Sequence, residues 1–120
     1  MMTINSYRDL KVWQAGMSIA KQCYFLTRKF PREETYGMTS QIRRSAASIP
    51  ANIDEGYGRE SSGDYVRFLR VAQGSLKELE THLILSSEVQ LVQSAETAPL
   101  LRACDEAGRM LRALIRSLET

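Results

Sequence analysis

The chain has 120 residues, of which 43% are hydrophobic and 25% are charged, a composition typical of one globular domain. We therefore expect a single domain over residues 1–120. The 16 basic and 14 acidic residues give a net charge of +2, which excludes a uniformly basic protein, so any nucleic-acid surface must come from local clustering.

No stretch approaches the roughly 18 apolar residues of a membrane-spanning helix, and the opening MMTINSYRDLKVW lacks the apolar core of a signal peptide. We expect a cytoplasmic protein with no membrane partner. Cys23 and Cys104 lie far apart in the chain, without the paired spacing of zinc ligands. We expect two buried, reduced thiols rather than a disulfide.

The first predicted helix spans residues 9–29. The members of its main apolar stripe are three or four residues apart, which places them on one helix face: Leu10, Trp13, Met17, Ala20 and Tyr24. Phe30 is followed by Pro31. Because a proline disfavours helical geometry in the preceding residue, we expect the helix to end there.

The second predicted helix spans residues 33–57, and its first turn contains two acids, which suit the positive end of a helix dipole. Its stripe is Ile42, Ala46, Ile49, Ile53 and Tyr57. A proline inside a helix costs about 3 kcal/mol and removes one backbone hydrogen bond, but the stripe continues unchanged across Pro50. We therefore expect a continuous helix with a kink at Pro50.

Gly56 and Gly58 follow this helix. A phosphate-binding loop needs a strand before its glycines, so we expect a simple hinge in which one of the two glycines has positive φ. Ser61 and Asp64 have the spacing of a capping box, which predicts the start of a third helix over residues 62–90. Its apolar stripe is Tyr65, Leu69, Ala72, Leu76, Leu79 and Leu83.

The fourth predicted helix spans residues 96–119, after a polar break near Gln93 and Ser94. Its stripe is Leu101, Cys104, Gly108, Leu111, Ile115 and Leu118. Four amphipathic helices with short connections and no strand pattern predict an all-α fold, an antiparallel up-down four-helix bundle with a proline-kinked second helix.

The first and fourth helices are apolar over a wider arc than a bundle requires. The additional residues are Val12, Ile19, Cys23, Leu26 and Phe30 on the first helix, and Met110 and Leu114 on the fourth. Because every helix of an isolated four-helix bundle has an outer face, this surplus predicts an interface with further copies of the chain.

Arginines are concentrated on one side of the fourth helix. Arg102, Arg109, Arg112 and Arg116 fall within an arc of about 80°, which is consistent with a surface for polyanions. Asp105 falls in the same arc and can pair with Arg102 or Arg109. The alternative is therefore a solvated helix face with ion pairs inside the helix.

Candidate catalytic residues are few. His82 is the single histidine, and a metal site or a general base would need converging partners for it. Asp54 and Glu55 are adjacent in a predicted helix, so their side chains point about 100° apart and do not share a target. We expect no catalytic residue, no metal, no cofactor and no small-molecule substrate.

Five segments of the chain resemble a known family: DLKVWQ (9–14), YGMTSQIRR (36–44), SIPANIDEG (48–56), YVRFL (65–69) and GSLKELET (74–81). They are similar to the bacterial four-helix-bundle proteins named for the 23S ribosomal RNA intervening-sequence protein, over residues 8 to about 92. Asp54 departs from the family pattern, which usually has alanine there, and its negative charge disfavours phosphate binding nearby.

The resemblance implies self-association. The family is related to the accessory protein of diversity-generating retroelements, a basic, barrel-like pentamer that works beside a reverse transcriptase and nucleic acid. It implies a homopentamer, and it carries no catalytic residues over to this chain. Because the resemblance includes Arg43 and Arg44, we consider phosphate contact for both, against pairing with an acid such as Glu55 or with a helix end of a neighbouring subunit.

The sequence thus predicts a non-enzymatic, homo-oligomeric accessory protein that binds RNA or DNA through arginines displayed repeatedly around a ring. The alternative is an oligomeric scaffold that binds another protein and no nucleic acid.

Overall fold

Four long α-helices make up most of the computed structural model, which describes residues 6–120; residues 1–5 of the expected domain lie outside the described residues. The helices are α1 (Lys11–Thr27), α2 (Met38–Tyr57), α3 (Ser62–Glu88) and α4 (Ser94–Glu119), with short 3-10 turns η1 (Tyr7–Asp9) and η2 (Arg32–Glu34). Residues 6–120 contain no β-strand. The prediction of an all-α, four-helix fold is confirmed.

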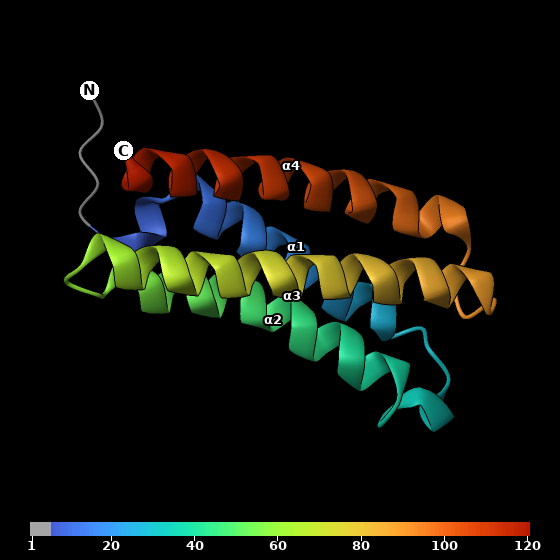
Figure 1. Cartoon of the computed structure of the whole chain (residues 1–120). Coiled ribbons are helices and arrows are strands. Elements are labelled where there is room, and N and C mark those ends of the chain that lie inside the picture. Colours follow the sequence, from blue (N-terminus) through green and yellow to red (C-terminus); the bar gives the residue numbers. More distant parts are fainter. Residues whose placement is uncertain (1–5) are drawn as a thin grey trace.

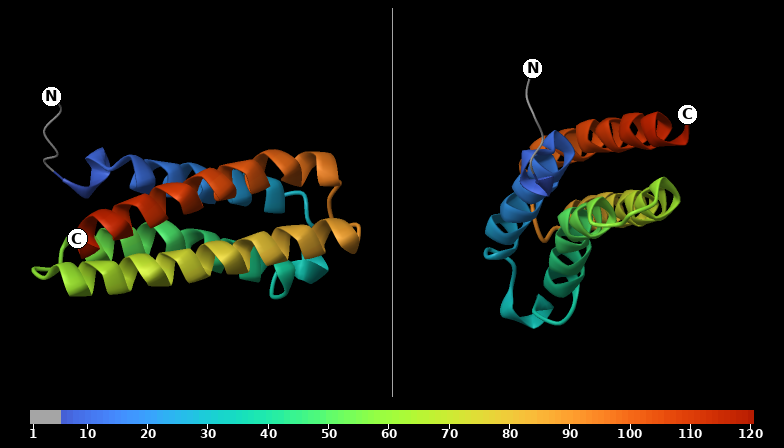
Figure 2. Two further views of the ribbon diagram at one scale, coloured as in Figure 1. Left: turned by 45° about the horizontal axis from the view of Figure 1, so that its top comes forward. Right: turned by 90° about the vertical axis from the view of Figure 1, so that its left-hand side faces the viewer.

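Consecutive helices run in opposite directions and lie side by side (Figures 1 and 2). In Figure 1, α3 lies at the front, α4 above it, α2 below it and α1 behind. α2 packs between α1 and α3, and α4 packs against both α3 and α1. The bundle measures 44 × 25 × 22 Å.

The burial of the two apolar stripes of α1 is the reverse of what we expected: the additional stripe lies in the core, and most of the main stripe is at the surface. Four of the residues expected at an interface between copies, Val12, Ile19, Cys23 and Leu26, are buried in the core of their own chain, and so is Phe30 beyond the end of α1. Met110 and Leu114 of α4 are partly buried against the same core. The interface prediction is therefore wrong for Val12, Ile19, Cys23, Leu26 and Phe30, because their own chain already covers them. For Met110 and Leu114, which are partly exposed, it stays a prediction.

Gly16 explains why the additional stripe of α1, rather than the main stripe, faces the core. A Cβ atom at Gly16 would lie 3.2 Å from Ile49 Cγ2 and 3.4 Å from the Pro50 nitrogen, so α1 and α2 approach each other closely at this glycine. Gly16 lies on the same side of α1 as Val12 and Ile19. The stripe that contains Met17 and Tyr24 consequently faces solvent.

α2 begins later than expected and runs without interruption through Pro50. Arg32–Glu34 form the separate turn η2, and the Glu34 carboxylate accepts a hydrogen bond of 3.0 Å from the Met38 N–H at the start of α2. The continuity of α2 across Pro50 is confirmed, and the kink there stays a prediction. Its expected core residues Ile42, Ala46, Ile49 and Ile53 are fully buried.

The turn between α2 and α3 corrects our interpretation of the glycines. Gly58 has φ −77°, and no glycine among residues 6–120 has positive φ. Gly56 is needed for another reason: a Cβ there would lie 2.9 Å from Phe68 Cβ and 3.1 Å from the Tyr65 carbonyl oxygen. The expected cap of α3 is confirmed, since the Ser61 hydroxyl accepts a hydrogen bond of 3.1 Å from the Asp64 N–H.

The left-handed conformation occurs instead at Gln90, with φ 67°. Leu91 N–H donates to the Ser86 carbonyl and Gln90 N–H to the Ser87 carbonyl, the pattern of a Schellman motif. This motif ends α3 before residue 90. α4 then begins at Ser94, two residues earlier than expected, with a capping box between Gln93 and Glu96.

We predict that Gly56→Ala lowers the free energy of unfolding by about 1–3 kcal/mol, because the new methyl group would overpack a contact with backbone and Cβ atoms. Urea unfolding followed by circular dichroism measures the change. Gly58→Ala is the matched control: its Cβ would meet nothing closer than 3.7 Å, so it should leave stability equal or slightly higher. Equal stability of the two variants would contradict the close approach at Gly56.

Candidate functional site

An open groove of about 640 Å³ runs between α1 and α2, and we call it the α1–α2 groove. Its floor consists of small side chains: Ala20, Ala47, Pro50 and Ala51. Its walls are large: Tyr7, Trp13, Met17, Tyr24 and Phe25. Lys21 and Arg28 lie toward the C-terminal end of α1 and Asp54 lies near the end of α2.

Two aromatic side chains of the groove are substantially exposed. Tyr24 is 43% exposed and Phe25 is 54% exposed. Tyr7 packs edge to face on Trp13, with their ring centroids 5.2 Å apart. Contiguous exposed apolar surface of this kind is typical of interaction sites. Sequence reasoning missed the groove because it assigned the Trp13–Met17–Tyr24 stripe to the core; Gly16, on the other apolar side of α1, was the signal that could have corrected the assignment.

Arg43 has a structural role within the chain. Its Nε donates a hydrogen bond of 2.8 Å to the Thr27 hydroxyl, and its guanidinium lies 4.5 Å from the centroid of the Tyr24 ring. The buried Thr27 hydroxyl in turn donates to the Cys23 carbonyl at 2.8 Å. Arg43 therefore ties α2 to the last turn of α1, and the helix end that it contacts belongs to its own chain.

Arg44 connects α2 to α3. It forms an ion pair with Glu78 and a hydrogen bond with Gln41. Hydrogen bonding to the Arg44 guanidinium lowers the pKa of the Glu78 carboxyl group. His82 Nε2 lies 3.5 Å from the same carboxylate. Glu55, the partner that we considered for these arginines, instead pairs with Arg59 at 2.8 Å.

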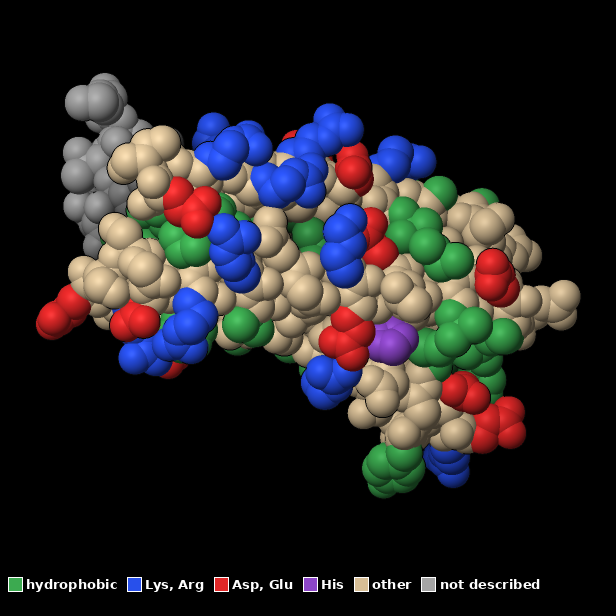
Figure 3. Space-filling model, in the orientation of Figure 1, with side chains coloured by type: hydrophobic (Ala, Val, Ile, Leu, Met, Phe, Trp, Pro, Cys, Tyr) green, Lys and Arg blue, Asp and Glu red, His purple; other side chains and the backbone are tan. Residues whose placement is uncertain are grey.

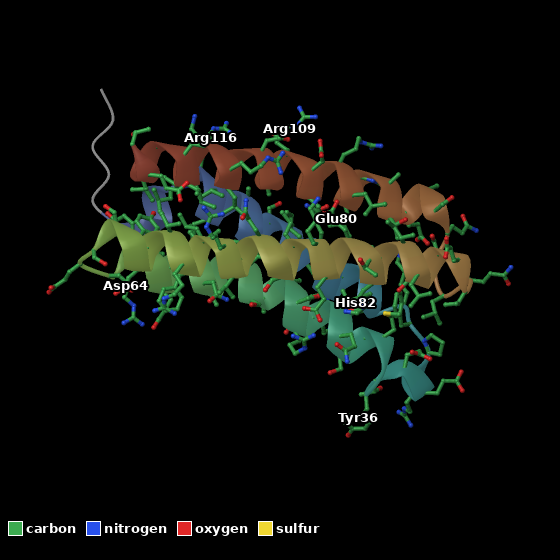
Figure 4. All side chains as sticks on the ribbon, viewed as in Figure 1. Tyr36, Asp64, Glu80, His82, Arg109 and Arg116 are labelled. Atoms are coloured by element: carbon green, nitrogen blue, oxygen red, sulfur yellow. The ribbon has the colours of Figure 1, made fainter. Side chains whose placement is uncertain are left out.

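The arginines of α4 form a row on the surface of the bundle, away from the α1–α2 groove. We call Arg102, Arg109, Arg112 and Arg116 the arginine ridge. Figure 3 shows Lys and Arg side chains gathered over α4 and the neighbouring part of α3. Arg109 and Arg116 point from α4 away from the bundle (Figure 4).

The charges of the ridge are only partly neutralised. Arg109 pairs with Asp105 at 3.0 Å, as the helical spacing predicts. Beside the ridge, Arg70 pairs with Glu119 at 2.8 Å and Lys77 with Glu80 at 3.2 Å. Arg102, Arg112 and Arg116 form no ion pair with any residue in the range 6–120.

Possible catalytic groups do not converge. Glu80 Oε1 and His82 Nε2 are buried and make no hydrogen bond of good geometry within the described part of the chain, although Lys77 Nζ and the Glu78 carboxylate lie 3.2 Å and 3.5 Å from them. Two residues apart on α3, the two side chains point about 160° apart. Glu80 lies toward α4, whereas His82 lies on the other side of α3 (Figure 4). Among the side chains that the structure describes, no three His, Cys, Asp or Glu residues form a group that could hold a metal ion.

The helices of the described region are also too short or too polar to span a membrane.

Comparisons with known proteins agree with the fold. A family model described as "23S rRNA-intervening sequence protein" matches residues 8–113. Among solved structures, the chain is similar to a protein of unknown function of the S23 ribosomal protein family from Bacteroides thetaiotaomicron. The two share 23% sequence identity over 87% of this chain and 97% of the other, with a TM-score of 0.78. No curated protein matches the chain. The relation to the retroelement accessory protein stays a prediction.

Cys23 and Cys104 are free and buried, as expected, and burial raises the pKa of each thiol to about 12. The thiolate is the reactive species, and at pH 8 it would be roughly one ten-thousandth of each group. We predict that neither cysteine reacts with Ellman's reagent within minutes in the native protein and that both react in urea. Rapid reaction of native thiols would contradict their place in the core.

Proposed function

The chain belongs to the 23S rRNA-intervening sequence protein family, and we propose that it is a non-catalytic, self-associating protein that binds the phosphate backbone of RNA or DNA through the arginine ridge. The observation that carries this proposal is the row of four exposed arginines on α4, three of which have no ionic partner within residues 6–120. The description of the family names 23S rRNA, which is consistent with an RNA-related role.

The one ion pair within the ridge does not prevent phosphate binding. The side chain of Arg109 is 74% exposed, and an exposed ion pair contributes at most about 1 kcal/mol. A phosphate can therefore replace Asp105 at small cost. Arginine also suits phosphate geometrically, because its planar guanidinium donates two parallel hydrogen bonds.

Self-association would allow individually weak arginine–phosphate contacts to give stable binding of a nucleic acid. Each copy offers only a few arginines, but a homo-oligomer, for which five copies is our expected number, displays the ridge once per subunit. Linked sites then bind one nucleic-acid strand with an avidity well above that of each single site. The exposed aromatic walls of the α1–α2 groove support self-association.

An oligomeric scaffold without nucleic acid is the second candidate. It is favoured by the engagement of Arg43 and Arg44 within the chain, which removes both of these arginines as candidates for phosphate contact. The candidates that remain are the four arginines of the ridge.

We predict that the protein binds mixed-sequence oligonucleotides with slight sequence preference and that binding weakens as salt increases. For each phosphate contact the log–log slope should be roughly −0.7 on single strands and −0.9 on duplex DNA. Arg112→Gln with Arg116→Gln should flatten the slope, because two phosphate contacts are lost, while helicity and particle mass stay unchanged. Fluorescence anisotropy at low and physiological salt measures both effects.

Arg32→Gln with Arg59→Gln is the matched control, since it removes the same charge from exposed positions away from the ridge. Its slope should equal that of the native protein. Absence of binding tighter than millimolar at low salt would reject nucleic-acid binding and leave the scaffold. Equal slopes for both double variants would reject the ridge as the site.

A further inference from the structure

We propose that the α1–α2 groove of one copy receives the C-terminal end of α3 from a second copy, so that the protein assembles head to tail. The inserting surface, which we call the α3 patch, consists of Ile84, Leu85, Glu88 and Val89. This inference rests on the self-association in the proposed function and names the two surfaces that form the contact.

The α3 patch is apolar and accessible. Ile84, Leu85 and Val89 are between 42% and 56% exposed, although they lie within six consecutive residues. Leu85 and Val89 are four residues apart, as are Ile84 and Glu88, so each pair stacks along the helix. Figure 3 shows hydrophobic side chains gathered beside His82, over the C-terminal part of α3.

Charge complementarity favours this pairing. Lys21 and Arg28 lie at the groove, and neither forms an ion pair with a described residue; Arg28 only stacks on Phe25, at 4.9 Å from the ring centroid. Glu88 in the patch likewise forms no ion pair within residues 6–120. The last turn of α3 also carries the negative end of the helix dipole. A patch that enters the basic end of the groove therefore brings opposite charges together.

Shape and charge disfavour the two symmetric alternatives. Two grooves cannot fill one another, because both surfaces are concave. Two α3 patches would bring Glu88 against Glu88, a contact between like charges. The groove lies between α1 and α2 and the patch lies on α3, at the front of the bundle in Figure 1 with α1 behind it. A contact between unlike surfaces is heterologous, and it closes into a ring when the rotation between subunits allows it.

The proposed contact leaves the arginine ridge free. The patch begins at Ile84, beyond Lys77 on α3, and the ridge lies on α4. Both surfaces of the contact are therefore separate from the surface proposed for phosphate, and each proposal has its own test.

Complementation between two defective variants tests a heterologous interface. The groove variant carries Met17→Lys and Phe25→Lys, and the patch variant carries Leu85→Lys and Val89→Lys; all four positions are exposed, and lysine near the end of α3 suits the helix dipole. Light scattering should give each variant the monomer mass of 13.6 kDa. Mixed, they should form a one-to-one dimer of about twice that mass, because one groove and one patch remain intact.

Val71→Lys is the matched control, since Val71 is an exposed valine on α3 outside the patch, and it should keep the native mass. A native protein that is monomeric at micromolar concentration would overturn the proposal, as would a patch variant of native mass or a mixture that stays monomeric. A large native particle that binds no oligonucleotide would reject the phosphate site alone.

A charge exchange provides a second test if a lysine variant loses helicity in circular dichroism. Glu88→Lys should lower the particle mass by placing a like charge at the basic end of the groove. Adding Lys21→Glu and Arg28→Glu to the same chain should restore the mass. Failure of the triple variant to regain the native mass, with helicity intact, would reject the assigned contact.

Discussion

The close approach of α1 and α2 at Gly16 is the constraint on which the rest of the structure depends. A Cβ atom there would lie 3.2 Å from Ile49 Cγ2 and 3.4 Å from the Pro50 nitrogen, so the glycine sets both the spacing of the two helices and the rotation of α1. With Gly16 facing α2, Val12 and Ile19 enter the core. The opposite apolar stripe must then lie outside, beside Pro50, where it forms the wall of the groove.

Polar contacts reinforce this arrangement. Thr27 is buried at the end of α1, and a buried hydroxyl needs hydrogen-bond partners. Arg43 donates to it from α2, while Arg44 reaches Glu78 on α3. Two neighbouring arginines of α2 thus form polar contacts with the helices on either side of it, Arg43 with α1 and Arg44 with α3. Their engagement leaves α4, whose Arg112 and Arg116 form no ion pair within residues 6–120, as the surface proposed for phosphate.

The proposed functions divide the bundle between its helices. The α1–α2 groove and the end of α3 would join copies of the chain, and the arginine ridge would face the solvent of the assembly. Phosphate contacts that are individually weak then gain from repetition around the oligomer. Because the arginines are concentrated on α4, a chain with a net charge of only +2 can present a locally basic surface.

The sequence alone determined the number and approximate extent of the helices, because apolar residues three or four apart specify a helix face wherever that face meets a core. Ile42 and Ile49 of α2, and Leu69 and Leu76 of α3, are buried as their spacing predicts. Periodicity could not decide between the two stripes of α1, since both are apolar and both have helical spacing. Only the packing of Gly16 against α2 decided it, through a contact between residues far apart in the chain.

For the site residues too, the sequence predicted contacts within one helix but not contacts between helices. Arginine identity and spacing correctly predicted the Arg109–Asp105 pair, which is local to one helix. The partners of Arg43 and Arg44 come from α1 and α3, and the reason for Gly56 is the proximity of Phe68 and Tyr65 across the turn. Local spacing determined the helices and the contacts within each helix. The contacts between helices were decided by tertiary packing, because they depend on how each helix is rotated relative to its neighbours, and sequence periodicity does not specify that rotation.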